Sequence, residues 1–166
     1  MESFAQSSSD GNLFIANGID AVLVWDGVGT SAVPAGVIPP ATALDIAASG
    51  IGGIGGTYYG FVRFVDGRGN FSNLSPISDP AIAVNNGQID YTNVPIPTVG
   101  TVVRRQIIRN TDGSIGATDP VTGIVRNIAY VDIDTTDLAS TSFTSFRLDA
   151  DLATQEQVDV DAASVE

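Results

Sequence analysis

The chain has 166 residues, of which 43% are apolar and 16% are charged, and a chain of this size and hydrophobicity can build a core instead of remaining disordered. It contains no Cys, no His and no Lys, and its basic residues are seven Arg, which excludes disulfides, thiolate chemistry, Cys- or His-ligated zinc and a Lys Schiff base. The formal charge of −12 opposes binding to phosphate backbones and anionic lipids, so we expect no nucleic-acid partner and no membrane partner.

The first 40 residues are predicted to form two segments that precede the main domain. Residues 1–11 lack the basic and apolar regions of a signal peptide and are predicted to be a flexible N-terminal arm. Within residues 12–40, two short apolar runs flank Asn17-Gly18, a dipeptide that favours a tight turn. We therefore expect a β-hairpin, followed by a Pro/Gly linker that ends at Pro39-Pro40.

The main domain is predicted to begin at 41–49 with a strand, for which a short helix is the alternative. The glycine-rich residues 50–56 are predicted to be a flexible connector, because they lack the Lys and the following helix of a phosphate-binding loop. The strongest predicted strand is 57–65, with a turn at 66–70 and a return strand at 71–77. Alternation places Arg63 on the more solvated face of that strand, and the other face is expected to be buried: Tyr58, Gly60, Val62 and Phe64.

Further strand patterns follow along the chain. The turn signal Asn85-Asn86-Gly87 predicts a hairpin between 81–84 and 88–91. Later strands are expected at 102–109, 124–133 and 141–146. Residues 148–166 are acidic and are predicted to be a C-terminal tail that is solvated, or that orders only against a partner.

Eight to ten short strands separated by turn signals predict an all-β fold. An antiparallel β-sandwich at residues 41–147 is favoured over a small barrel, because several strands alternate between apolar and polar positions and would each have one dry face. Extended termini would flank this domain.

Two segments resemble parts of fibronectin type III-like domains. Residues 56–76 (GTYYGFVRFVDGRGNFSNLSP) resemble their last hairpin, and residues 102–109 (VVRRQIIR) resemble a strand that often ends in Arg. The order of the two segments differs from the usual one, so the resemblance implies a sandwich that is permuted or only fibronectin-like.

The wider layout resembles tailed-bacteriophage virion structural proteins. Residues 12–20 (NLFIANGID) with 24–27 (VWDG) resemble their opening, and the 58–76 hairpin, the 104–109 strand and the 148–153 ending follow in the same order. This resemblance implies a non-enzymatic component of the tail, adaptor or fibre region, with capsid decoration as a variant. It also implies location in the virion, assembly with other virion structural proteins and homo-oligomerisation within the particle.

Candidate sites are few, and the sequence indicates no catalytic residue and no cofactor. Asp132, Asp134 and Asp137 form the most metal-like cluster, because carboxylates at this spacing can ligate Ca²⁺. The alternative is that they cap local turns. Without a base, no Ser or Thr is assigned as a nucleophile. The alternative function is a fibronectin-like module of a surface or secreted protein that binds carbohydrate or protein.

Overall fold

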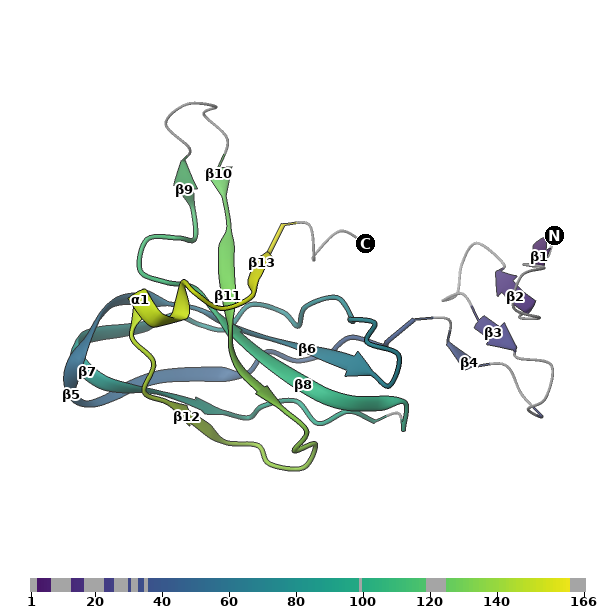
Figure 1. Ribbon diagram of the computed structural model, residues 1–166, viewed down its shortest axis with the longest axis horizontal. Helices are drawn as coiled ribbons and strands as arrows, with labels where there is room; N and C mark the ends of the chain where they lie inside the picture. Colours follow the sequence, from purple (N-terminus) through teal and green to yellow (C-terminus); the bar gives the residue numbers. More distant parts are fainter. Residues whose placement is uncertain are drawn as a thin grey trace.

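A computed structural model describes residues 3–6, 13–16, 23–25, 30, 33–34, 36–98, 100–118 and 125–161. Its strands form an N-terminal sheet, a two-stranded ribbon and the two antiparallel sheets of a sandwich (Figure 1). The predicted all-β sandwich is confirmed. No helix in these ranges is both long enough and apolar enough to cross a membrane.

The N-terminal sheet has the order β1-β2-β3-β4. The predicted hairpin is confirmed in its pairing, because Leu13 lies opposite Trp25 and Ile15 opposite Leu23, while its turn lies outside the described residues. The prediction of a flexible arm is wrong for residues 3–6, which pair with the first strand of the hairpin. The strands are β1 Ser3–Gln6, β2 Leu13–Ala16, β3 Leu23–Trp25 and β4 Val33–Pro34.

The sandwich consists of a three-stranded sheet, β12-β7-β5, and a four-stranded sheet, β13-β11-β8-β6. A separate ribbon of β9 and β10 precedes β11 and projects away from both sheets (Figure 1). The remaining elements are β5 Asp45–Tyr58, β6 Gly60–Asp66, β7 Ala81–Thr92, β8 Val102–Arg109, β9 Ala117–Thr118, β10 Val125–Arg126, β11 Ile128–Thr135, β12 Phe143–Ser145, α1 Asp149–Leu152 and β13 Gln157–Asp159.

The main core lies between the two sheets and contains Tyr58, Val62, Phe64, Ile89 and Ile107 among its buried residues. The predicted buried face of 57–65 is therefore confirmed. These residues do not form one strand, however, because the chain crosses from one sheet to the other at Tyr59. Tyr58 pairs with Ala81 in the three-stranded sheet, whereas Gly60 pairs with Arg109 in the four-stranded sheet.

A second apolar cluster covers the other face of the four-stranded sheet, with Phe61, Leu74, Ile108, Val131 and Val158 among its members. The expectation that the Arg63 face is solvated is therefore wrong, since Arg63 is 8% exposed.

The predicted acidic tail is also wrong for residues 148–161. This segment forms α1 and β13, and β13 pairs with β11. Burial of Leu152 and Val158 provides the apolar contact that fixes it.

The predicted return strand at 71–77 covers the edge of β6 through a three-residue serine repeat. Ser72, Ser75 and Ser78 donate their backbone N–H groups to the carbonyls of Phe64, Val62 and Gly60, respectively. Each serine Oγ accepts a hydrogen bond from the backbone N–H of the same β6 residue. This segment therefore satisfies the edge of β6 without forming a regular strand of its own.

The glycine-rich residues 50–56 lie inside β5, so the predicted connector is wrong. The predicted hairpin at 85–87 is also wrong, because β7 runs continuously through these residues beside β5, with shifts of register at this level. The two backbones approach closely here: a Cβ on Gly52 would lie 2.6 Å from Gly87 Cα. The glycine and Asn-Gly signals thus mark a close approach of two strands, not a connector and a turn.

Candidate functional site

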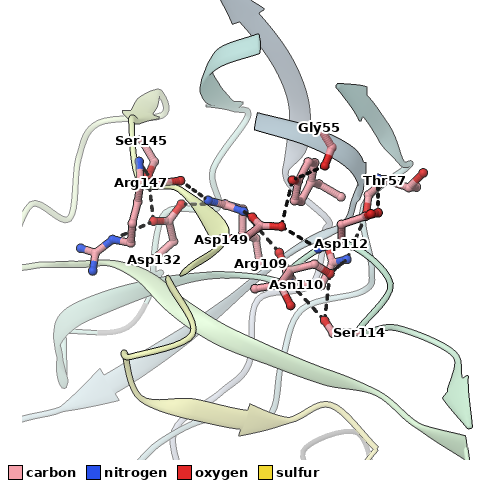
Figure 2. Close-up of polar contacts among 12 residues, drawn as sticks. Gly55, Thr57, Arg109, Asn110, Asp112, Ser114, Asp132, Ser145, Arg147 and Asp149 are labelled. Carbon is pink, nitrogen blue, oxygen red and sulfur yellow. Dashed lines mark hydrogen bonds and ion pairs between the residues drawn. The ribbon is translucent and has the colours of Figure 1, made fainter. Parts of the chain in front are cut away.

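The most elaborate polar arrangement in the described residues is an ion-pair network at one end of the sandwich (Figure 2). Its centre is Arg109, the last residue of β8, whose Nε donates to Asp132 Oδ2 on β11 at 3.1 Å. Both side chains are fully buried. Two opposite charges withdrawn from water in this way need further hydrogen bonds to compensate for their lost hydration.

Asp132 obtains these bonds from β7, from β12 and from Arg147, which follows β12. The Tyr91 hydroxyl on β7 donates to Oδ2 at 2.6 Å, and the Ser145 hydroxyl on β12 donates to Oδ1 at 2.8 Å. Arg147 Nε lies 3.3 Å from Oδ1. One carboxylate therefore joins β7 and β12 of one sheet to β8 and β11 of the other.

Arg109 also holds the C-terminal segment. Its Nη1 donates to Asp149 Oδ1 in α1 at 3.0 Å, and its Nη2 donates to the carbonyl of Arg147 at 2.6 Å. The other oxygen of Asp149 accepts hydrogen bonds from the Tyr58 hydroxyl and from the backbone N–H of Asp112. The segment that begins at Arg147 is thereby fixed to the sandwich by charge as well as by apolar contact.

Asn110, next to the network (Figure 2), fixes the point at which the chain changes sheets. Its Nδ2 donates to the carbonyl of Thr57 at 3.0 Å, and its Oδ1 accepts the backbone N–H of Tyr59 at 2.6 Å. The Thr57 N–H donates to Asp112 Oδ1 at 3.0 Å. Backbone groups that leave one sheet before joining the other therefore find side-chain partners.

The electrostatics of the network favour fixed charges over proton transfer. Burial, reinforced by the neighbouring carboxylates Asp132 and Asp149, respectively, raises the pKa of Tyr91 and of Tyr58. Burial lowers the pKa of Arg109, but interactions with its neighbours, the carboxylates Asp132 and Asp149 among them, outweigh it and the net shift is upward. Both phenols therefore stay protonated and the guanidinium stays charged near neutral pH, so these three groups act as hydrogen-bond donors.

A second buried arginine, Arg105, lies on the same face of β8 at the other side of Ile107. Its guanidinium donates to the carbonyls of Pro95, Asp137 and Ser140 at 2.6–3.0 Å. Burial lowers the pKa of Arg105.

The three candidate calcium ligands are not brought together. Asp132 lies in the buried network, Asp134 pairs with Arg104 at 2.5 Å, and Asp137 accepts the backbone N–H groups of Ala139 and Ser140 at 2.9 Å. Among the described residues, no three acidic side chains form a group that could hold a metal ion. The bonds of Asp137 match the turn-capping alternative.

A shallow cavity of about 280 Å³ lies where residues 38–42 reach the sandwich. Pro39, Pro40, Phe64, Pro95 and Ile96 line much of its wall. None of its lining residues carries an ionisable side chain, so the cavity offers an apolar contact surface and no acid–base chemistry.

The sequence reasoning missed Arg109, Tyr91 and Asp149 as members of one network. A usable signal was present, because Arg105 and Arg109 alternate with Ile107 on one face of an apolar strand. An arginine on a buried face requires a carboxylate or several carbonyl partners. The sequence alone does not say which partner each arginine takes.

Comparison with models of known protein families and with curated protein sequences finds no match.

Proposed function

We propose that the chain is a non-enzymatic structural component of a tailed-phage particle, in the tail, adaptor or fibre region, that acts by assembly with other virion proteins. The motif order at residues 12–27, 58–76, 104–109 and 148–153 supports this proposal through its resemblance to such proteins.

The observation on which the proposal depends most is an uncovered apolar sheet face. Ile82 and Val84 on β7 are 75% and 82% exposed. Aliphatic side chains grouped on the outside of a sheet are typical of surfaces that bind another protein. A protein that works through contacts needs such a surface and needs no reactive group.

The buried network is consistent with the same role. Its tyrosines and arginines link both sheets to the C-terminal segment as hydrogen-bond donors to Asp132 and Asp149. We therefore assign the network to mechanical stability, which a particle component needs when it is held by its neighbours.

Purified particles of the phage that encodes the chain provide the test. We expect mass spectrometry to detect the chain in particles, and gold-labelled antibody to mark the tail in electron micrographs. Label on the head would replace the tail assignment by capsid decoration. Absence of the chain from intact particles, together with saturable binding of the purified chain to glycans, would instead support the fibronectin-like binding module.

A further inference from the structure

The outer face of the three-stranded sheet has an apolar end that we call the neutral face: Ile51, Gly53, Gly55, Ile82 and Val84. Along β7, Ala81 and Ala83 are buried in the sandwich, whereas Ile82 and Val84 between and after them are exposed. Ile51, in the irregular part of β5, is 91% exposed. These three aliphatic side chains therefore point to solvent although the core is fully built without them.

The face is flat at Gly55, where the backbone carries no side chain. Gly53 and Gly55 are exposed on β5 beside buried Ile54. The Cβ position of Gly55 lies 4.0 Å from Ala83 O and Asn85 N, the backbone atoms on either side of Val84. The backbone at Gly55 thus lies bare next to projecting aliphatic groups, whereas Leu148 covers Gly53, its Cδ2 lying 3.7 Å from the Cβ position of that glycine.

The charge distribution indicates what kind of surface can cover this face. None of the chain's seven Arg and 19 acidic residues falls within 46–58 or 81–89, and the carboxylate of Asp112 reaches β5 only at Gly56 and Thr57, outside the five residues of the neutral face. Elsewhere the chain is strongly acidic, with a formal charge of −12. Two copies of an acidic protein repel each other where carboxylates meet, and this repulsion is smallest where both surfaces are uncharged. A basic partner would be drawn to the acidic surface instead.

The geometry points to a second copy of this chain as the occupant, and we propose that two copies associate through their neutral faces. Related by a two-fold axis, each copy presents the same patch to the other. The aliphatic groups of one copy then lie over the bare backbone at Gly55 of its partner, and none of the five residues of the neutral face brings a charge into the contact. This inference deepens the proposed function, because it names the contact through which the assembly would begin.

Sedimentation velocity of the purified full-length chain, from micromolar to millimolar concentration, tests the proposal. We expect a reversible monomer–dimer equilibrium that tightens as salt is added, because salt screens the repulsion between two acidic copies. A chain that stays monomeric at millimolar concentration, or an association that weakens with salt, would overturn the proposal.

Three substitutions locate the contact. Ile82→Asp and Val84→Asp should each raise the dissociation constant at least tenfold, because each places a carboxylate against the same face of the partner copy. Ile77→Asp is the matched control, since Ile77 is 49% exposed outside the neutral face, and should leave the dissociation constant unchanged. Association that survives both face substitutions, or that is lost with Ile77→Asp alone, contradicts this site.

Further measurements distinguish loss of the fold, absence of the neutral-face contact and failure of the proposed function. Thermal unfolding of each variant checks that the fold is kept, and Ile51→Asp, at the most exposed of the three positions, replaces any variant that unfolds. The chain found in particles yet monomeric in solution would refute the neutral-face contact alone. A dimer through the neutral face, with the chain absent from particles, would refute the proposed function alone.

Discussion

Arg105 and Arg109 lie four residues apart on the inner face of β8, and both side chains are fully buried, yet they are compensated in different ways. Arg109 meets the fully buried carboxylate of Asp132, and its pKa is raised. Arg105 is held by backbone carbonyls, its nearest carboxylate oxygen on Asp137 lies 3.8 Å away on a side chain 42% exposed, and its pKa is lowered.

The difference shows two ways of placing a cation inside a sandwich. At Arg109, two fully buried charges depend on each other, so removing either leaves the other with only a partly exposed partner, Asp149 for Arg109 and Arg147 for Asp132. At Arg105, the carbonyls belong to loops whose residues Asp137 and Ser140 are exposed, and water can reach such groups when the guanidinium is removed. The first arrangement should be less tolerant of substitution than the second.

The largest effect is therefore expected from Asp132→Asn. This change keeps the shape of the side chain but removes the charge opposite Arg109, so we expect a loss of about 3–5 kcal/mol in the free energy of unfolding. Urea denaturation monitored by far-UV circular dichroism measures this loss. A loss below about 1 kcal/mol would mean that Asp149 alone compensates Arg109, and the contrast with Arg105 would be wrong.

Arg105→Met should cost less, about 1–3 kcal/mol, because it removes hydrogen bonds from carbonyls that can be hydrated. Its aliphatic chain still fills the space between Ile107 and the loops. The same denaturation experiment applies, with Arg109→Met as the matched substitution four residues away. If Arg105→Met lowers the free energy of unfolding as much as Arg109→Met does, carbonyl dipoles and a carboxylate compensate a buried guanidinium equally well. The expected contrast between the two arginines would then be wrong.

Much of the sandwich can be predicted from the sequence because strand alternation reports burial on one face. The Tyr58, Val62 and Phe64 face and the range of β8 were both predictable in this way. What alternation does not report is the second covering layer over Phe61 and Ile108. Part of that layer comes from residues 148–161, whose acidic composition hides the two apolar side chains that join it: Val158 and Val160.

The predictions for the glycine-rich residues 50–56 and for the Asn-Gly turn signal at 85–87 were wrong for a related reason. Both are local signals for chain reversal or flexibility, but Gly52 and Gly87 here permit two long strands to touch. The partner of each segment lies more than 30 residues away, and no local pattern specifies it. The polar network was unpredictable for the same reason, since Asp132 and Arg109 become partners only through the register of β11 on β8.

The loop at Asp137, whose carbonyl accepts hydrogen bonds from Arg105, can be tested through the pH dependence of stability. Hydrogen bonds from Ser140 and the N–H of Ala139 lower the pKa of this exposed carboxyl from 3.8 to about 2. A carboxyl with a lowered pKa in the folded state stabilises the fold above pH 3.8, and this contribution is lost as the pH falls through about 2.

Asp137→Asn should accordingly lower the melting temperature at neutral pH by less than Arg105→Met does, and the difference from the wild type should vanish toward pH 2. Thermal unfolding of both proteins between neutral pH and pH 2 checks this. A difference that grows on acidification would mean that the ionised carboxylate does not stabilise the loop that holds Arg105.

The smallest effect is expected at Arg104, the neighbour of Arg105 in the sequence, which lies on the opposite face of β8. It pairs with Asp134 at 2.5 Å, but the two side chains are 38% and 35% exposed. Water and salt screen such a pair, so Arg104→Met should change the free energy of unfolding by about 0–1 kcal/mol. Any such contribution should disappear in about 1 M salt, where the screening length is about 3 Å. The loss caused by Asp132→Asn should persist there, because salt does not reach the buried pair. A salt-independent loss at Arg104 would show that exposure along β8 does not decide how strongly an arginine is coupled to its carboxylate.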